Sequence, residues 1–248
     1  MGISILQLGI LESIVIPPED YTKLLLHFNG IDGSTEIIDS SSQHHSFTVV
    51  GDAQLDTAQK KFGTASLLVD GIDDTILSSD APSGDWGEIG GGDFTVECWI
   101  RLANINKDQV IAQCGYALPY SPRSLVWLFY INSSNQIAFL IGDGDWTYII
   151  WYVETSHTIS QNVWTHIAVT RSGNTIYIFK DGELTTGYST TLNNFYTSAV
   201  ENLYIGGYAD NIGGWVIELD GWIDEFRLSK GIARWTSNFT PPTEEYTS

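Results

Sequence analysis

Basic residues are scarce in this chain. Its 248 residues include 11 lysines and arginines against 30 aspartates and glutamates, which gives a net charge of −19. An acidic body of this size repels phosphate backbones, so the charge argues against a nucleic-acid partner. The surplus of carboxylates fits a plain solubility role, and it also fits divalent-cation binding at some of them.

Cysteine is nearly absent as well. The two cysteines, Cys98 and Cys114, are too few for a disulfide framework in a chain of this length, and they lack zinc-site spacing. Cys98 lies in an alternating run, in phase with Phe94 and Val96, which predicts a small core residue. A disulfide between the two cysteines stays open at this stage.

The chain has no apolar run long enough to span a bilayer, so we expect no membrane insertion. Residues 2–16 are apolar, but Glu12 interrupts them and no lysine or arginine precedes them, unlike a signal peptide. We expect residues 1–20 to form an extended arm that docks on a partner or on the domain's own edge, because Pro17 and Pro18 then end it. The candidate docking side chains are Ile3, Ile5, Leu6, Leu8, Ile10 and Leu11.

Long stretches of helical periodicity are also missing. Short runs of strand-forming residues recur instead, with turn residues between them, and they favour two packed antiparallel sheets over a parallel α/β sheet. Asp181-Gly182 predicts a tight hairpin turn, and the glycine-rich tract 80–93 predicts a loop. The clearest strand-like runs are 23–28, 46–50, 66–69, 75–77, 94–102, 110–113, 124–131, 136–141, 148–153, 164–171, 175–180, 202–206 and 221–228.

Five phrases stand in the order seen in laminin-G-like jelly rolls of the concanavalin A type. They are GTASLLVDGIDD (63–74), GDFTVECWI (92–100), VWTHIAVTR (163–171), IFKDG (178–182) and GWIDEFRL (221–228). This resemblance implies an all-β, two-sheet antiparallel jelly-roll sandwich over residues 21–243, with the extended N-terminal arm before it and a short tail, 244–248, after it. Lectins, adhesive domains and glucanases share this fold, so the fold alone does not choose the function.

The phrase FRLSKGIARWTSNFTPP, residues 226–242, narrows the resemblance. It is similar to the C-terminal phrase of the version found in structural proteins of tailed bacteriophages. The resemblance implies a virion appendage on a tail or capsid, assembled in the host cytoplasm and then extracellular. Its partners would be other virion proteins or further copies of the chain, held through the arm. The alternative expectation is a secreted carbohydrate-binding or adhesive module.

The resemblance also implies a structural Ca²⁺ that joins the last strand to the first loop. Asp224 alternates in phase with Phe226 and Leu228, so we expect it to point inward, where a carboxylate needs a cation or hydrogen-bond donors. Asp39 resembles the family's early Asp-Ser-x-Gly element without its glycine, and Asp32 lies close by. We expect Asp39, Asp224 and Asp32 at a cation; the alternative is a network of hydrogen-bonded carboxylates.

Aromatic residues suggest a sugar-binding surface. Trp99 and Trp164 lie in strand-like runs and are expected in the core or on a sheet face. The run 142–148 combines acidic and aromatic residues, whose rings can stack on sugar C–H faces while the carboxylates pair with hydroxyls. The same aromatics also suit a protein interface or plain packing. The candidate ligand-binding residues are Trp146, Tyr148, Asp143, Asp145, Trp151, Trp86 and Trp215.

Catalysis has weak support in the sequence. Glucanases of this fold place two carboxylates as Glu-x-Asp-x-x-Glu on one strand, so that an acid and a nucleophile flank the sugar bond. The nearest match is Glu218-Leu-Asp220, where Ile223 stands in place of the second glutamate. We therefore expect no catalytic residues. The sequence predicts a non-enzymatic virion structural protein that displays a laminin-G-like domain to host-surface glycans, and a glycoside hydrolase is the least favoured alternative.

Overall fold

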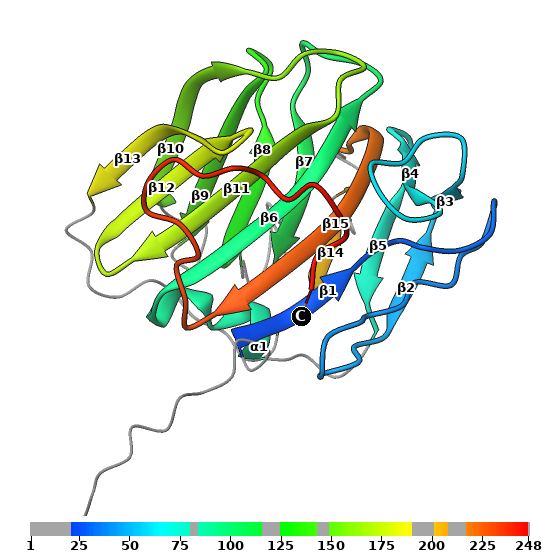
Figure 1. The fold of residues 1–248 in the computed structure, drawn as a ribbon, viewed down its shortest axis with the longest axis horizontal. Coiled ribbons are helices and arrows are strands. Elements are labelled where there is room, and N and C mark those ends of the chain that lie inside the picture. Colours follow the sequence, from blue (N-terminus) through cyan, green and yellow to red (C-terminus); the bar gives the residue numbers. More distant parts are fainter. Residues whose placement is uncertain are drawn as a thin grey trace, which may run out of the picture.

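Two antiparallel β-sheets lie face to face in the computed structural model, which describes residues 21–79, 84–115, 125–142, 149–189, 201–207 and 217–247 (Figure 1). The eight-stranded sheet has the order β13 (Glu183–Ser189), β12 (Thr175–Lys180), β11 (Thr165–Ser172), β6 (Phe94–Leu102), β15 (Asp220–Lys230), β4 (Ser66–Asp70) and β3 (Gln54–Asp56), and β1 (Thr22–Leu26) also pairs with β15. The seven-stranded sheet has the order β10 (Ile149–Thr158), β9 (Gln136–Gly142), β8 (Trp127–Ile131), β7 (Gln109–Cys114), β14 (Leu203–Ile205), β5 (Thr75–Ser78) and β2 (Phe47–Val50). The predicted two-sheet antiparallel sandwich is confirmed.

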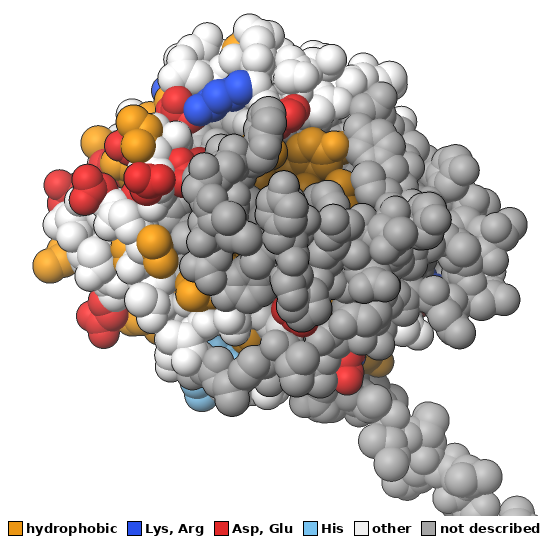
Figure 2. All heavy atoms as spheres, turned by 180° about the vertical axis from the view of Figure 1, so that it is seen from behind, with side chains coloured by type: hydrophobic (Ala, Val, Ile, Leu, Met, Phe, Trp, Pro, Cys, Tyr) orange, Lys and Arg blue, Asp and Glu red, His pale blue; other side chains and the backbone are white. Residues whose placement is uncertain are grey.

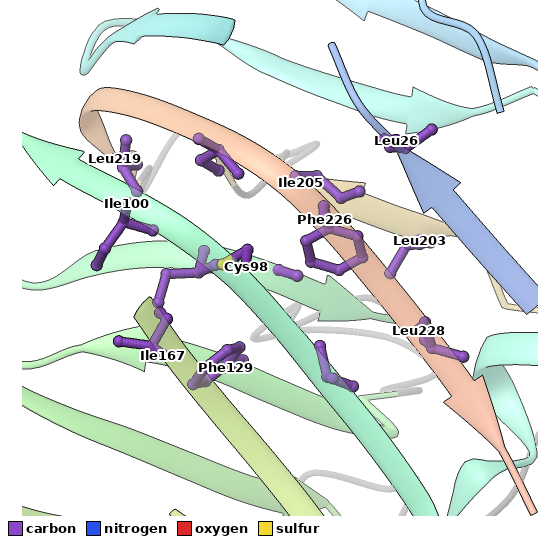
Figure 3. Packing of buried hydrophobic residues seen from close by; sticks show 14 of the residues in the cluster. Leu26, Cys98, Ile100, Phe129, Ile167, Leu203, Ile205, Leu219, Phe226 and Leu228 are labelled. Atoms are coloured by element: carbon purple, nitrogen blue, oxygen red, sulfur yellow. The ribbon is translucent and has the colours of Figure 1, made fainter. Parts of the chain in front are cut away.

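The main core fills the space between the sheets. Alternate residues of β6 point into it, and Figure 3 shows Cys98 and Ile100 there with Phe226 of β15, opposite Phe129 of β8 and Ile205 of β14. Cys98 is therefore the small core residue that its alternation predicts. Cys98 and Cys114 are both buried and free, and burial raises the pKa of each thiol well above its usual value.

The outer face of the eight-stranded sheet is covered too. After β15 the chain turns back across β6 and β11, and we call residues 231–247 the C-terminal strap (Figure 1). Thr170 Oγ1 in β11 donates to the carbonyl of Trp235 at 2.6 Å, and the rings of Trp235 and Phe239 stack with centroids 3.8 Å apart. Tyr246 is buried, so the folded domain continues past residue 243, where the sequence predicted a tail.

Two local predictions have opposite outcomes. Asp181 and Gly182 have φ of 49° and 76° and join β12 to β13, which confirms the predicted hairpin turn. The tract 80–93 was predicted to be a loop, but its described part contains a single helical turn, α1 (Gly84–Gly87), and a 3₁₀ turn, Ile89–Gly91. No helix in the described part of the chain is long and apolar enough to cross a membrane. The predicted arm, residues 1–20, with Ile3, Ile5, Leu6, Leu8, Ile10 and Leu11, lies outside the described residues.

Candidate functional site

Along the chain, the predicted sugar platform lies between β9 and β10, and β10 is an edge strand of the seven-stranded sheet. Gly142 at the end of β9 pairs with Ile149 at the start of β10. Trp151 lies in β10 opposite Ile141. Five other residues of the predicted ligand-binding set lie outside the described residues: Asp143, Asp145, Trp146, Tyr148 and Trp215.

Trp86 is a correction to the predicted sugar-binding set. Its side chain is 0% exposed and packs in the core between the sheets. Its indole nitrogen donates to the carbonyl of Glu201 at 2.8 Å, while Trp127 donates to the carbonyl of Trp86 at 2.8 Å. The helical turn α1 therefore buries Trp86 with its polar group satisfied, and the ring is not available to a ligand.

Trp99 and Trp164 lie where the sequence places them. Trp99 is 6% exposed and packs on the outer face of the eight-stranded sheet with Leu25 and Tyr246. Trp164 and Phe62 pack against the same small cluster. The outer face therefore carries a second apolar cluster, which the strap completes.

A β-bulge changes the direction of Asp224. In β15, Asp224 pairs with Trp99 and Arg227 pairs with Glu97, so Glu225 and Phe226 lie opposite a single residue of β6. Glu225 has φ of 52°, and the extra residue reverses the alternation that follows it. Phe226 points into the core, as predicted, but Asp224 lies on the outer face with Trp99. The predicted inward direction of Asp224 is wrong.

Asp224 is nevertheless fully buried, beneath the loop that precedes β4. Its Oδ2 accepts backbone N–H groups from Lys61 at 2.7 Å and Phe62 at 3.1 Å. Its Oδ1 is buried and has no hydrogen-bond partner among the described residues. Burial raises the pKa of Asp224 to about 7, against the two N–H groups, which lower it. A carboxyl in this position is readily protonated near neutral pH.

The other two predicted metal ligands are already bound by the protein. Asp39 accepts the N–H groups of Leu25, Ser41 and His45, and the hydroxyl of Ser41, at 2.8–3.0 Å. Asp32 Oδ1 accepts the N–H and hydroxyl of Thr57 at 3.0 and 3.1 Å. Within the described part of the chain, Asp32, Asp39 and Asp224 do not come together as a group of three ligands. A Ca²⁺ shared by them does not fit these contacts, whereas the alternative of hydrogen-bonded carboxylates fits Asp39 well.

A buried ion cluster under the strap is absent from the sequence-based predictions. Glu97 Oε1 accepts Nη2 and Nε of Arg227 at 2.6 and 2.8 Å, and Oε2 lies 3.2 Å from Nε2 of His166. Burial alone would raise the pKa of Glu97, but the charge of Arg227 and the contact with His166 hold it below its usual value. The register Arg227↔Glu97 creates this pair, so knowledge of the bulge would have been needed to find it.

The residues aligned with the glucanase pattern have separate environments. Glu218 is buried, and burial raises its pKa to about 7. Asp220 Oδ2 accepts Nδ2 of Asn104 at 2.7 Å and lies 3.3 Å from Nζ of Lys107. Ile223 is fully buried in the core between the sheets. The strand therefore presents a core side chain at the position where a glucanase has its second glutamate.

Sequence comparison identifies the family. The family model Laminin_G_3, described as the concanavalin A-like lectin/glucanases superfamily, matches residues 70–234, from the end of β4 into the strap. The chain belongs to the concanavalin A-like lectin/glucanases superfamily. No curated protein matches its sequence.

Solved structures with the same superfamily architecture include sugar-bound domains. Domain 4 of AbnA, a GH43 extracellular arabinanase from Geobacillus stearothermophilus solved with arabinotriose, has a TM-score of 0.59 and 16% identity over 86% of this chain and 93% of that one. The botulinum neurotoxin serotype D ligand-binding domain, solved with N-acetylneuraminic acid, has a TM-score of 0.57 and 17% identity over 87% of this chain. The binding domain of Paraclostridial Mosquitocidal Protein 1 has a TM-score of 0.57 and 15% identity over 86% of this chain. The present chain covers 49% of each toxin domain, and at these identities the likeness shows the fold alone.

Proposed function

We propose that this chain is a non-catalytic carbohydrate-binding module. The observation that carries the proposal is the position of the strap. It closes the outer face of the eight-stranded sheet, where Glu97, Trp99 and His166 are buried. This leaves the side of the seven-stranded sheet for a ligand, and the run 142–148, which is rich in acidic and aromatic residues, follows β9 of that sheet along the chain.

The superfamily supports this choice. The AbnA domain and the serotype D toxin domain share the fold and were solved with an arabinose oligomer and a sialic acid. The non-catalytic part of the proposal is supported by Ile223, a core residue where a glucanase strand places its second glutamate. Because Ile223 replaces that glutamate, Glu218 has no second glutamate on its strand with which to divide the acid and nucleophile roles.

A glycan array followed by calorimetry tests the proposal, with arabino-oligosaccharides and sialylated glycans as the first ligands. Trp146→Ala should weaken binding at least about tenfold, which is ~1.4 kcal/mol, through the loss of ring stacking on the sugar. Trp164→Ala is the matched control, because Trp164 packs on the opposite, outer face. The absence of glycan binding at high protein concentration, or a loss with Trp164→Ala and none with Trp146→Ala, would overturn the proposal.

For the biological context of the module, we propose that it is an appendage of a phage virion and docks through residues 2–16. The support is the resemblance of the phrase 226–242 to phage structural proteins, and the apolar side chains of the arm. Deletion of residues 2–16 should remove the protein from purified particles while the isolated domain keeps its folded circular dichroism spectrum. Unchanged incorporation into particles would reject the docking role. Flanking genes without capsid or tail proteins would favour a secreted adhesive module instead.

A further inference from the structure

Three side chains with metal-binding atoms meet at the end of the strap. A nitrogen of His27, a carboxylate oxygen of Glu225 and one of Glu245 all lie within 4.8 Å of one another. His27 directly follows β1, Glu225 belongs to the bulge of β15, and Glu245 belongs to the strap. Three segments that are far apart along the chain therefore contribute one potential ligand each.

Glu225 is the buried member of this group and is firmly oriented. Its two carboxylate oxygens lie 2.9 and 3.0 Å from Nδ1 of His27, and its Oε2 accepts the N–H of Tyr246 at 2.7 Å. The bulge that turns Asp224 to the outer face also turns Glu225 toward His27. Both carboxylate oxygens of Glu225 therefore face the imidazole before any ion arrives.

The other two members leave the group open to solvent. Glu245 is exposed, and the side chain of His27 is 20% exposed. Asn29 donates its side-chain N–H to Glu245 Oε1 and accepts the N–H of Thr64 at 2.5 Å. An ion can reach His27 and Glu245 from outside, and Asn29 holds the Glu245 carboxylate in position.

Gly63 leaves room for the oxygen atoms around this group. It has φ of 53°, and a Cβ at this position would overlap Asn29 Oδ1 and Glu245 Oε1. Next to Glu225, Asp224 has a buried Oδ1 that is unpartnered among the described residues. The neighbourhood thus brings the oxygens of Asn29 and Glu245 close to the backbone of Gly63 and leaves one buried oxygen of Asp224 without a partner among the described residues.

We propose that His27, Glu225 and Glu245 bind a divalent first-row metal ion of the zinc class. One imidazole nitrogen and two carboxylate oxygens are ligands that Zn²⁺ accepts, with water completing the coordination, whereas Ca²⁺ takes six to eight oxygens. Two carboxylates and a neutral imidazole balance the charge of the ion. The bound ion would fasten the end of the strap to β1 and to β15.

The test uses the full chain, freed of any tag and stripped with EDTA, titrated with ZnCl₂ and separately with CaCl₂ near neutral pH. We expect a single zinc to bind in preference to calcium. Glu245→Gln should weaken zinc binding at least about tenfold, since it removes a charged ligand. Glu244→Gln is the matched control, because the adjacent Glu244 is also exposed and lies outside the group.

A second variant and a second measurement guard against a misfolded mutant. His27→Gln should also weaken zinc binding, and zinc should slow hydrogen exchange at the amide of Tyr246, which donates to Glu225. Zinc binding equal to wild type in both Glu245→Gln and His27→Gln would overturn the proposal. So would the absence of zinc binding, or tighter binding of calcium than of zinc; His27 and Glu225 would then be a simple ion pair.

Discussion

Asp224 shows how far alternation along a strand can be trusted. The sequence predicted a buried carboxylate, and the side chain is buried, but on the opposite face from the one predicted. A period of two holds only while the strand pairs residue for residue, and the extra residue at Glu225 breaks that count. No local pattern marks Glu225 as a bulge, because its positive φ, 52°, depends on the fit of β15 to β6.

The raised pKa of Asp224 makes folding stability depend on pH. Its folded pKa, about 7, lies above its ordinary value of 3.8, so the native state favours the protonated form. Protonated Asp224 therefore stabilises the folded state fully below pH 3.8, and this stabilisation is lost as the pH rises to about 7. By linkage, it contributes at most ~4 kcal/mol to the free energy of unfolding, and we expect less than this maximum. Asp224→Asn removes this charge, so the stability of the variant relative to wild type should be higher at pH 8 than at pH 4.

Urea unfolding of both proteins at the two pH values measures the effect. Glu218, whose pKa burial also raises to about 7, stays in both proteins, so the difference between them isolates Asp224. An equal loss or gain of stability at both pH values would contradict the assigned pKa.

Among the elements, strands were predicted well and the strap was not. Residues 94–102 and 175–180 form β6 and β12 with the predicted bounds, because alternating β-branched and aromatic residues carry a clear period. β3, with three residues, is too short to show a period and was missed. None of the described residues of the strap forms a strand, so no alternation in its sequence indicates which face of the sheet it covers.

Gly182 links the predicted hairpin to the strap. It has φ of 76°, and a Cβ there would overlap the backbone oxygen of Phe239, whose N–H donates to the Gly182 carbonyl at 2.9 Å. Gly182→Ala should therefore cost ~1–2 kcal/mol for the left-handed backbone and a further ~1–3 kcal/mol for the overlap. Gly173→Ala is the control, because Gly173 has φ of 56° but nothing within 4 Å of a Cβ. If chemical denaturation gave equal losses in the free energy of unfolding for the two variants, the strap would be moving away from the new Cβ at Phe239 without cost.

For the whole molecule, the resemblance predicted the fold and family, and the function had to be argued from single features. The five phrases led to the lectin/glucanase superfamily, which the match over residues 70–234 confirms. Many ligands are bound by this one architecture, so the sugar and its site do not follow from it. The metal group is another case: His27, Glu225 and Glu245 meet only because the bulge and the strap bring them together.

The net charge of −19 should destabilise the folded chain at low ionic strength. On the face drawn in Figure 2, several acidic side chains lie close together at one edge of the described surface, with few basic side chains among them. Raising NaCl from about 0.02 M to about 0.5 M should raise the midpoint of thermal unfolding, because salt screens repulsion between exposed carboxylates. The buried Glu97–Arg227 pair is screened much less. A sucrose series is the control, and a midpoint that falls with salt would mean that surface ion pairs dominate instead.

β15 is the last described strand along the chain, yet it lies between β6 and β4 and also pairs with β1. During synthesis on the ribosome, β6 and β4 therefore cannot pair fully with β15 until residue 230 has emerged. Apolar faces made earlier, including those of β1 and β6, stay exposed for that interval, when aggregation competes with folding. The domain should thus depend on chaperones that hold nascent chains more than a protein whose central strands are made first.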